Sequence, residues 1–180
     1  MPPGSSKAHG LDRRRTEECS GFPPPPGRGI LDYVGRHCAK PTSIAGIQMV
    51  ILLDASVLIE AERGSFDLKQ FLDEHSDDGF ALSAITASEM LHGVHRATTR
   101  HLARREAFVE GLLAQIPVLP FDLIAARIHA RIWADAVSKG LSLGAHDLLI
   151  GAIALATGCL VATRDRRSFP NIPGLDVVLL

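Results

Sequence analysis

The sequence predicts an α/β protein with a mostly parallel sheet, and three observations support this. Short runs with no polar face alternate with longer segments whose apolar residues recur at helical spacing. Wholly apolar runs are typical of parallel strands that are covered on both sides. The 46% hydrophobic content with only 5% aromatic residues fits an aliphatic core in a chain of 180 residues. Alternation of this kind places helices on both faces of the sheet.

The pattern begins at Met49, and residues 1–48 differ in composition. They hold the run Pro23 to Pro26, several Gly and Ser, and no sustained periodicity. Such a segment buries too little apolar surface to offset its ordering entropy. Two interpretations stand: Met49 is the true start and an over-long gene model precedes it, or the segment is a genuine arm of low order. We expect one domain over residues 49–180 either way.

The first half of that domain predicts two strands and three helices. Residues 49–53 form a short apolar run that indicates a buried strand, and a short helix follows from Val57 until Gly64 stops it. The expected order then continues with a second helix capped by Ser65, a strand at 79–83 and a third helix opened by Thr86.

The second half predicts three longer helices and three strands. A helix at 99–115 is expected to bury a stripe of Leu102, Val109, Leu112 and Leu113. The remaining elements, in order, are a brief strand at 117–119, a long helix from the Asp122 cap to Gly140, a helix from Asp147 to Gly158, and strands at 159–163 and 176–180.

Charge and cysteine content exclude several classes of function. Residues 1–48 are basic and residues 49–180 are acidic, which argues against nonspecific nucleic-acid binding by bulk charge. The cysteines Cys19, Cys38 and Cys159 form neither a disulfide framework nor a zinc-site spacing. No secretory signal is visible, and the longest apolar stretch is shorter than the roughly 20 residues of a bilayer span. We expect a cytoplasmic protein without a membrane partner.

Four acidic residues stand where an apolar segment meets a turn or a helix start: Asp54, Glu89, Asp147 and Asp165. Strand ends and helix starts gather on one edge of a parallel sheet. Four carboxylates there repel each other unless a divalent metal lies between them. The pattern indicates a metal-dependent enzyme that cleaves phosphodiesters.

Each acid also has a structural interpretation. Asp54 or Ser56 could be the N-cap of a helix, and Asp147 could cap another. Glu89 could complete a capping box that begins at Thr86, and Asp165 could be an ordinary turn residue. The Ser56 hydroxyl could instead bind a phosphate oxygen or a metal-bound water. His146, beside Asp147, is interpreted as structural or solvent-facing. The coincidence of four acids on one edge favours the metal site.

The chain resembles the PIN-domain ribonucleases, and within them the VapC-type toxins of bacterial toxin–antitoxin pairs. The resemblance spans residues 49–180, and the ordered set of short motifs is more specific than any one of them. The motifs lie at residues 53–59, 83–93, 144–150 and 163–169, with a tail at 172–175. Ala55 stands where Thr is frequent in the family, and residues 1–48 have no counterpart in the compact toxins.

The resemblance implies a PIN-like α/β/α sandwich with a five-stranded parallel sheet. It implies Mg²⁺ or Mn²⁺ held by the four acids, with Asp54 and Asp147 central and with Glu89 and Asp165 acting partly through waters. Ser56 matches a small hydroxyl residue of the family. Family members hydrolyse RNA and leave a 5′-phosphate and a 3′-hydroxyl, so the implied activity is a metal-dependent endoribonuclease.

The resemblance also implies partners beyond the RNA substrate. A cognate antitoxin would lay a helix and an extended tail across the toxin, and a homodimer is expected. Arginines around the third and fourth predicted helices and after the fourth strand could form a basic rim for RNA, or a solvated face. They are Arg96, Arg100, Arg104, Arg105, Arg164, Arg166 and Arg167.

Two other functions compete with the nuclease. Haloacid-dehalogenase-like phosphatases also use an Asp at a strand end, but they carry a second Asp two residues later, where this chain has Ser56. A non-catalytic PIN-like module that binds RNA or protein is the other alternative. Loss of one acid would favour it, yet all four are present.

Overall fold

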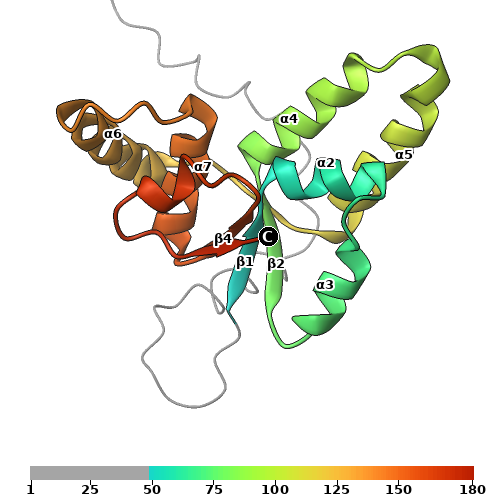
Figure 1. The fold of residues 1–180 in the computed structure, drawn as a ribbon, viewed down its shortest axis with the longest axis horizontal. Helices are drawn as coiled ribbons and strands as arrows, with labels where there is room; N and C mark the ends of the chain where they lie inside the picture. Colours follow the sequence, from blue (N-terminus) through green and yellow to red (C-terminus); the bar gives the residue numbers. More distant parts are fainter. Residues whose placement is uncertain (1–48) are drawn as a thin grey trace, which may run out of the picture.

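A computed structural model describes residues 49–180, and the predictions for residues 1–48 lie outside that range. A five-stranded parallel sheet with the order β3-β2-β1-β4-β5 forms the centre (Figure 1). Its strands are β1 (Val50–Leu53), β2 (Gly79–Ser83), β3 (Val118–Leu119), β4 (Leu160–Thr163) and β5 (Val177–Leu179). The α/β prediction and the parallel sheet are confirmed.

Helices cover both faces of this sheet, as expected from the alternation. They are α2 (Ala55–Arg63), α3 (Leu68–Glu74), α4 (Ala84–His95), α5 (Thr99–Gln115), α6 (Leu123–Ser138), α7 (Ala145–Thr157) and the short 3-10 helix η1 (Phe169–Asn171). Leu52 packs into the core beneath α6 and α7, whereas its neighbours Ile51 and Leu53 pack beneath α2 to α5. Alternate residues of one strand thus serve opposite layers, which Figure 1 shows on either side of the sheet.

The carboxyl ends of the central strands lie in register. Leu53 at the end of β1 pairs with Leu82 of β2 and with Ala162 of β4. The Asp54 N–H then donates to the carbonyl of Ala162 at 3.0 Å. Because of this register, residues that follow β1, β2 and β4 emerge at the same edge of the sheet, where ligands bind in open α/β folds.

Four helix starts differ from the sequence prediction. Helix α2 begins at Ala55, two residues before the predicted Val57, because Asp54 caps it. Helix α4 begins at Ala84 because the Ser83 hydroxyl accepts the Thr86 N–H at 2.8 Å. Glu89 therefore lies in the second turn, and the capping box predicted from Thr86 is wrong. Helix α7 begins at Ala145, which makes Asp147 its third residue rather than its cap.

The cap predicted for α3 is also wrong. Asp67 caps this helix by accepting the Gln70 N–H at 2.9 Å, while the Ser65 hydroxyl bonds to Glu60 instead. In α5 the predicted bounds are confirmed, but Leu102 is 38% exposed and lies outside the buried stripe. No helix within residues 49–180 is long and apolar enough to cross a membrane.

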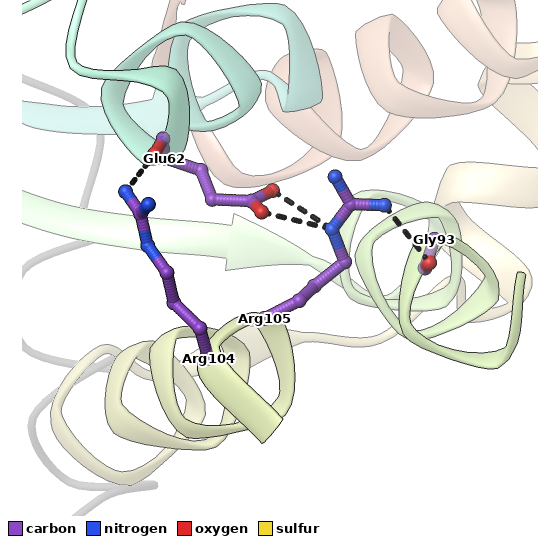
Figure 2. Close-up of polar contacts among 4 residues, drawn as sticks. All are labelled: Glu62, Gly93, Arg104 and Arg105. Carbon is purple, nitrogen blue, oxygen red and sulfur yellow. Dashed lines mark hydrogen bonds and ion pairs between the residues drawn. The ribbon is translucent and has the colours of Figure 1, made fainter. Parts of the chain in front are cut away.

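A polar clasp joins α5 to α2 and α4, formed by Glu62, Gly93, Arg104 and Arg105 (Figure 2). Arg105 Nε donates to both Glu62 carboxylate oxygens at 2.9 and 3.1 Å, and its Nη1 donates to the Gly93 carbonyl at 3.2 Å. Arg104 donates to the Glu62 carbonyl at 3.0 Å. Two arginines of the predicted basic rim therefore bind within the fold, whereas Arg96 is exposed.

Candidate metal centre

Asp54 is the most buried acid of the carboxylate edge, the name used here for Asp54, Glu89, Asp147 and Asp165. It is 6% exposed and caps α2 with its side chain. Its Oδ2 accepts the Ser56 N–H at 3.2 Å, the Ser56 hydroxyl at 2.6 Å and the Thr163 hydroxyl at 2.9 Å. The capping role and the place at the edge coexist, and these donors all reach one oxygen of the carboxylate.

Two hydroxyls tie the end of β1 to the end of β4. Ser56 Oγ accepts the Arg164 N–H at 3.0 Å, and Thr163 Oγ1 accepts the Asp165 N–H at 3.0 Å. Since each hydroxyl also donates to Asp54, the Ser56 hydroxyl is engaged within the protein rather than presented to a ligand. Its predicted contact with phosphate or water stays a prediction.

Asp165 follows β4 and closes a tight turn. Its carboxylate accepts the backbone N–H groups of Arg167 at 2.7 Å and Ser168 at 3.2 Å. Desolvation by burial acts to raise the pKa of Asp165, but hydrogen bonds from Arg167 N–H and from Ser168 outweigh it and hold the pKa below its ordinary value. Asp165 is therefore a charged turn residue at the carboxylate edge, which confirms the turn interpretation, while its role as a metal ligand stays a prediction.

Asp147 lies in the first turn of α7 and carries the opposite perturbation. Burial raises the pKa of Asp147 above its ordinary value, and the charges of Asp54 and Asp165 raise it further, against a hydrogen bond from Ser168 and the charge of His146. Asp147 therefore lies near enough to Asp54 and Asp165 for their charges to act on it. Asp147 is the one whose charge is least compensated.

The residue that caps α7, Gly144, leaves room for this carboxylate. A Cβ atom built on Gly144 would lie 2.2 Å from Asp147 Oδ2, well inside van der Waals contact. Gly144 has an ordinary φ of -61°, so its requirement is for space rather than for backbone freedom. Any other residue would force the Asp147 side chain to move.

Glu89 reaches the edge from α4 and meets the start of α7. Its Oε1 lies 2.6 Å from Nδ1 of His146, the residue before Asp147. This contact places the Glu89 carboxylate beside α7, without a direct bond to the aspartates among the described contacts. His146 is exposed, as expected, but it also binds an acid of the site, which the sequence did not predict.

The carboxylate edge presents only hard oxygen donors, which suits Mg²⁺ or Mn²⁺ better than softer metals. Within residues 49–180, no ion pair reaches Asp54, Asp147 or Asp165. In the same range, no three acidic, His or Cys side chains converge closely enough to hold a metal ion. The donor set and its uncompensated charge fit a divalent cation, while the side chains are not gathered into a coordination shell.

The sequence analysis did not identify three residues that act on the acids of the carboxylate edge: Thr163, Ser168 and His146. Thr163 was predicted only as a strand residue, yet its buried hydroxyl orients Asp54 across 109 residues of sequence. Ser168 is buried, its backbone N–H donates to Asp165 at 3.2 Å, and its side chain acts to lower the pKa of both Asp147 and Asp165. Their position within the quoted motifs was the only available signal, because the contacts are made across the fold.

A shallow cleft of about 420 Å³ lies elsewhere, between α6, α7 and the segment before β5. Ile132, Leu155 and Pro173 line it, together with Arg131 and Asp135. Asp135 is already paired with Lys139 at 2.7 Å. No acid of the carboxylate edge lines this cleft, so its location does not bear on the metal site.

Comparison with known proteins agrees with this architecture. The model of the PIN domain family matches residues 51–175. "Ribonuclease VapC1" of Rickettsia felis is 31% identical over 131 residues, which cover 72% of this chain and 96% of that protein. "VapC ribonuclease Y4jK" of Sinorhizobium fredii is 34% identical over 137 residues, with the same coverage.

Solved structures give the same result. The DNA-bound VapBC complex from Salmonella typhimurium contains a chain that superposes with a TM-score of 0.66 at 26% identity, covering 73% of this chain and 98% of that one. The chain described here belongs to the PIN-domain family, among the VapC ribonucleases.

Proposed function

We propose that this protein is a metal-dependent endoribonuclease that hydrolyses RNA phosphodiester bonds and acts as the toxin of a toxin–antitoxin pair. The observation that carries the proposal is the carboxylate edge, where Asp147 is half-buried near Asp54 and Asp165 and no ion pair within residues 49–180 reaches these three acids. The VapC relatives support the choice of RNA as substrate, because their names describe ribonucleases.

The four acids Asp54, Glu89, Asp147 and Asp165 would hold Mg²⁺ or Mn²⁺. When bound, the cation lowers the pKa of a water nucleophile and offsets charge on the phosphate oxygens. The protein's own part is to fix the oxygens: Ser56 and Thr163 orient Asp54, and Ser168 orients Asp147 and Asp165. Cleavage leaves a 5′-phosphate and a 3′-hydroxyl. An RNA substrate places the activity in the cytoplasm.

The test is cleavage of total cellular RNA by the full chain with Mg²⁺, with Mn²⁺ and with EDTA. Asp54→Asn and Asp147→Asn are the site variants, and Glu62→Gln, which lies in the clasp, is the carboxylate control. We expect discrete products in either metal that vanish with EDTA and in both site variants, and that persist in the control. Cleavage that survives EDTA would contradict the metal site. RNA binding without cleavage in both metals would favour the non-catalytic module.

An antitoxin is the expected protein partner, because a similar structure from Mycobacterium tuberculosis is a member of the VapBC family of toxin–antitoxin systems. The uncompensated charge of the carboxylate edge suits an incoming Arg or Lys side chain, which would neutralise the acids and occupy the site. Co-expression with the cognate antitoxin should yield a complex that does not cleave RNA. Charge reversal of the partner's basic residue should restore cleavage without dissociating the partner.

A second copy of the chain is the other expected partner, and α6 supplies a face for it. Leu123, Trp133 and Val137 are 67%, 56% and 66% exposed although they are large and apolar. With Ala126 and Ala130 they follow alternating spacings of three and four residues, the pattern of a helix–helix seam.

The oligomeric state tests this pairing. Light scattering on the eluting full chain should give a dimer mass, and Trp133→Glu should give a monomer that still melts cooperatively. Leu102→Glu, another exposed apolar residue, is the matched control on α5 and should remain dimeric. A wild-type monomer, or a Trp133→Glu dimer, would exclude α6 as the interface.

A further inference from the structure

His146 and Glu89 form a contact that neither the sequence pattern nor the expected four-acid site requires. Their atoms Nδ1 and Oε1 are 2.6 Å apart, although the residues are separated by 57 positions. Among the described ion pairs of the protein, this one alone involves an acid of the carboxylate edge. It also joins α4 to the turn of α7 that carries Asp147, so it spans the two elements that bring these acids together.

The contact is the one hydrogen bond described for the Glu89 side chain. Asp54 receives three donors at one oxygen, and Asp165 receives two backbone N–H groups. The Glu89 side chain is 31% exposed on α4, where a long side chain without a partner samples several rotamers. Fixing such a side chain costs rotamer entropy, which a charge-assisted hydrogen bond of ordinary strength offsets.

We infer that His146 is a positioning residue, which holds the Glu89 carboxylate at the first turn of α7 so that it can join the cation held by the aspartates. This role rests on the proposed metal site. Only Oε1 of Glu89 is engaged by the imidazole, and Oε2 has no described partner. An outer hydrogen bond of this kind orients a metal-binding carboxylate, and its loss typically weakens metal affinity about 10- to 100-fold.

Binding of Mn²⁺ alone, without RNA, tests this role directly. The full chain is titrated with Mn²⁺, and the free ion is followed by its electron paramagnetic resonance signal. His146→Ala removes the donor, whereas His146→Asn keeps an amide N–H close to the place of Nδ1. His101→Ala, an exposed histidine on α5, is the control. We expect about tenfold weaker Mn²⁺ binding in His146→Ala, near wild-type binding in His146→Asn, and no change in the control.

A double-mutant cycle shows whether His146 acts through Glu89. In a Glu89→Ala background, His146→Ala should cause no further loss of Mn²⁺ affinity. Unchanged or tighter Mn²⁺ binding in His146→Ala overturns the inference, because the contact would then be neutral or would compete with the metal. A further loss in the Glu89→Ala background overturns it as well, since His146 would then act on the metal by itself.

The proposed metal site fails separately from this inference. Wild-type protein that binds no Mn²⁺, or an Asp147→Asn variant that binds as tightly as wild type, overturns both the metal site and the role of His146. Tight wild-type binding that is lost in Asp147→Asn and unaffected by His146→Ala overturns only the positioning role.

Discussion

Two partly buried carboxylates of this protein, Glu62 and Asp147, have opposite electrostatic surroundings. In the clasp, Glu62 is 12% exposed and is bound by the guanidinium of Arg105 (Figure 2). At the carboxylate edge, Asp147 is also partly buried, but its close charged neighbours include two other aspartates, and its pKa is raised. A compensated charge joins helices together, whereas an uncompensated one costs stability and is retained where it serves binding of a cation.

We therefore expect substitutions at the carboxylate edge to reduce RNA cleavage and substitutions in the clasp to reduce stability. Asp147→Asn removes one of three repelling charges and keeps the shape of the side chain. RNA cleavage should fall by about 10²- to 10³-fold, as for removal of one electrostatic contributor to a transition state, while the melting temperature holds or rises. Cleavage rates and thermal unfolding of the same preparation measure both. A large loss of stability would show that Asp147 holds the fold rather than the chemistry.

Filling the space beside Gly144 should reduce RNA cleavage nearly as much as Asp147→Asn does. Gly144→Ala places a Cβ atom where the Asp147 carboxylate lies, so that carboxylate must swing away. A displacement of about 1 Å at a reacting centre can cost up to about 10²-fold in rate, and cleavage should fall on the order of 10- to 100-fold. Gly111→Ala in α5 meets no atom within 4 Å and should stabilise the protein by about 0.5–1 kcal/mol. Equal cleavage by the two variants would refute the clash.

The hydroxyl of Thr163 should show an intermediate effect on activity with a cost in stability. Thr163→Val leaves Asp54 without one donor and the Asp165 N–H without its acceptor. Cleavage should fall about tenfold, and unfolding free energy should drop by about 1–3 kcal/mol. Thr157→Val, which loses only hydrogen bonds near the end of α7, is the matched control and should cleave normally. Normal cleavage by Thr163→Val would make its bond to Asp54 dispensable.

Breaking the clasp should reduce stability and have the smallest effect on RNA cleavage. Arg105→Ala leaves the Glu62 carboxylate without its partner, so unfolding free energy should fall by about 1–2 kcal/mol, discounted because Arg105 is 31% exposed. Cleavage by the folded protein should stay within about twofold. Lys69→Ala breaks a far more exposed pair with Asp73, and urea unfolding should detect no clear loss of stability. Equal losses of unfolding free energy in the two variants would show that the clasp stabilises the protein no more than an exposed ion pair does.

Local patterns predicted most of the fold. The apolar runs located β1 and β2, and periodicity gave the full bounds of α5 because long amphipathic helices carry a strong repeating signal. The start of α4 was misplaced because Thr86 and Glu89 imitate a capping box. The competing cap, Ser83, ends a strand whose extent depends on its neighbours in the sheet.

Local sequence signals predicted the acids of the carboxylate edge but not the residues that hydrogen-bond to them. Asp54 and Asp165 were found because they end apolar runs, and a parallel sheet brings such ends together. The donors that fix them were not found, because Thr163 meets Asp54 across 109 residues and His146 meets Glu89 across 57. Such contacts depend on side-chain directions set by packing, which no periodicity encodes.

The hydrogen bond between Thr163 and Asp54 also bears on the stage of synthesis at which the protein can become harmful to the cell that makes it. Asp54 emerges early from the ribosome, but the hydroxyl and the backbone N–H that organise it belong to β4 and the turn after it. A chain that stops before Thr163 therefore lacks one of the donors to Asp54. If the proposed site carries the activity, β4 must be synthesised before the protein can cut RNA, including the message still being translated.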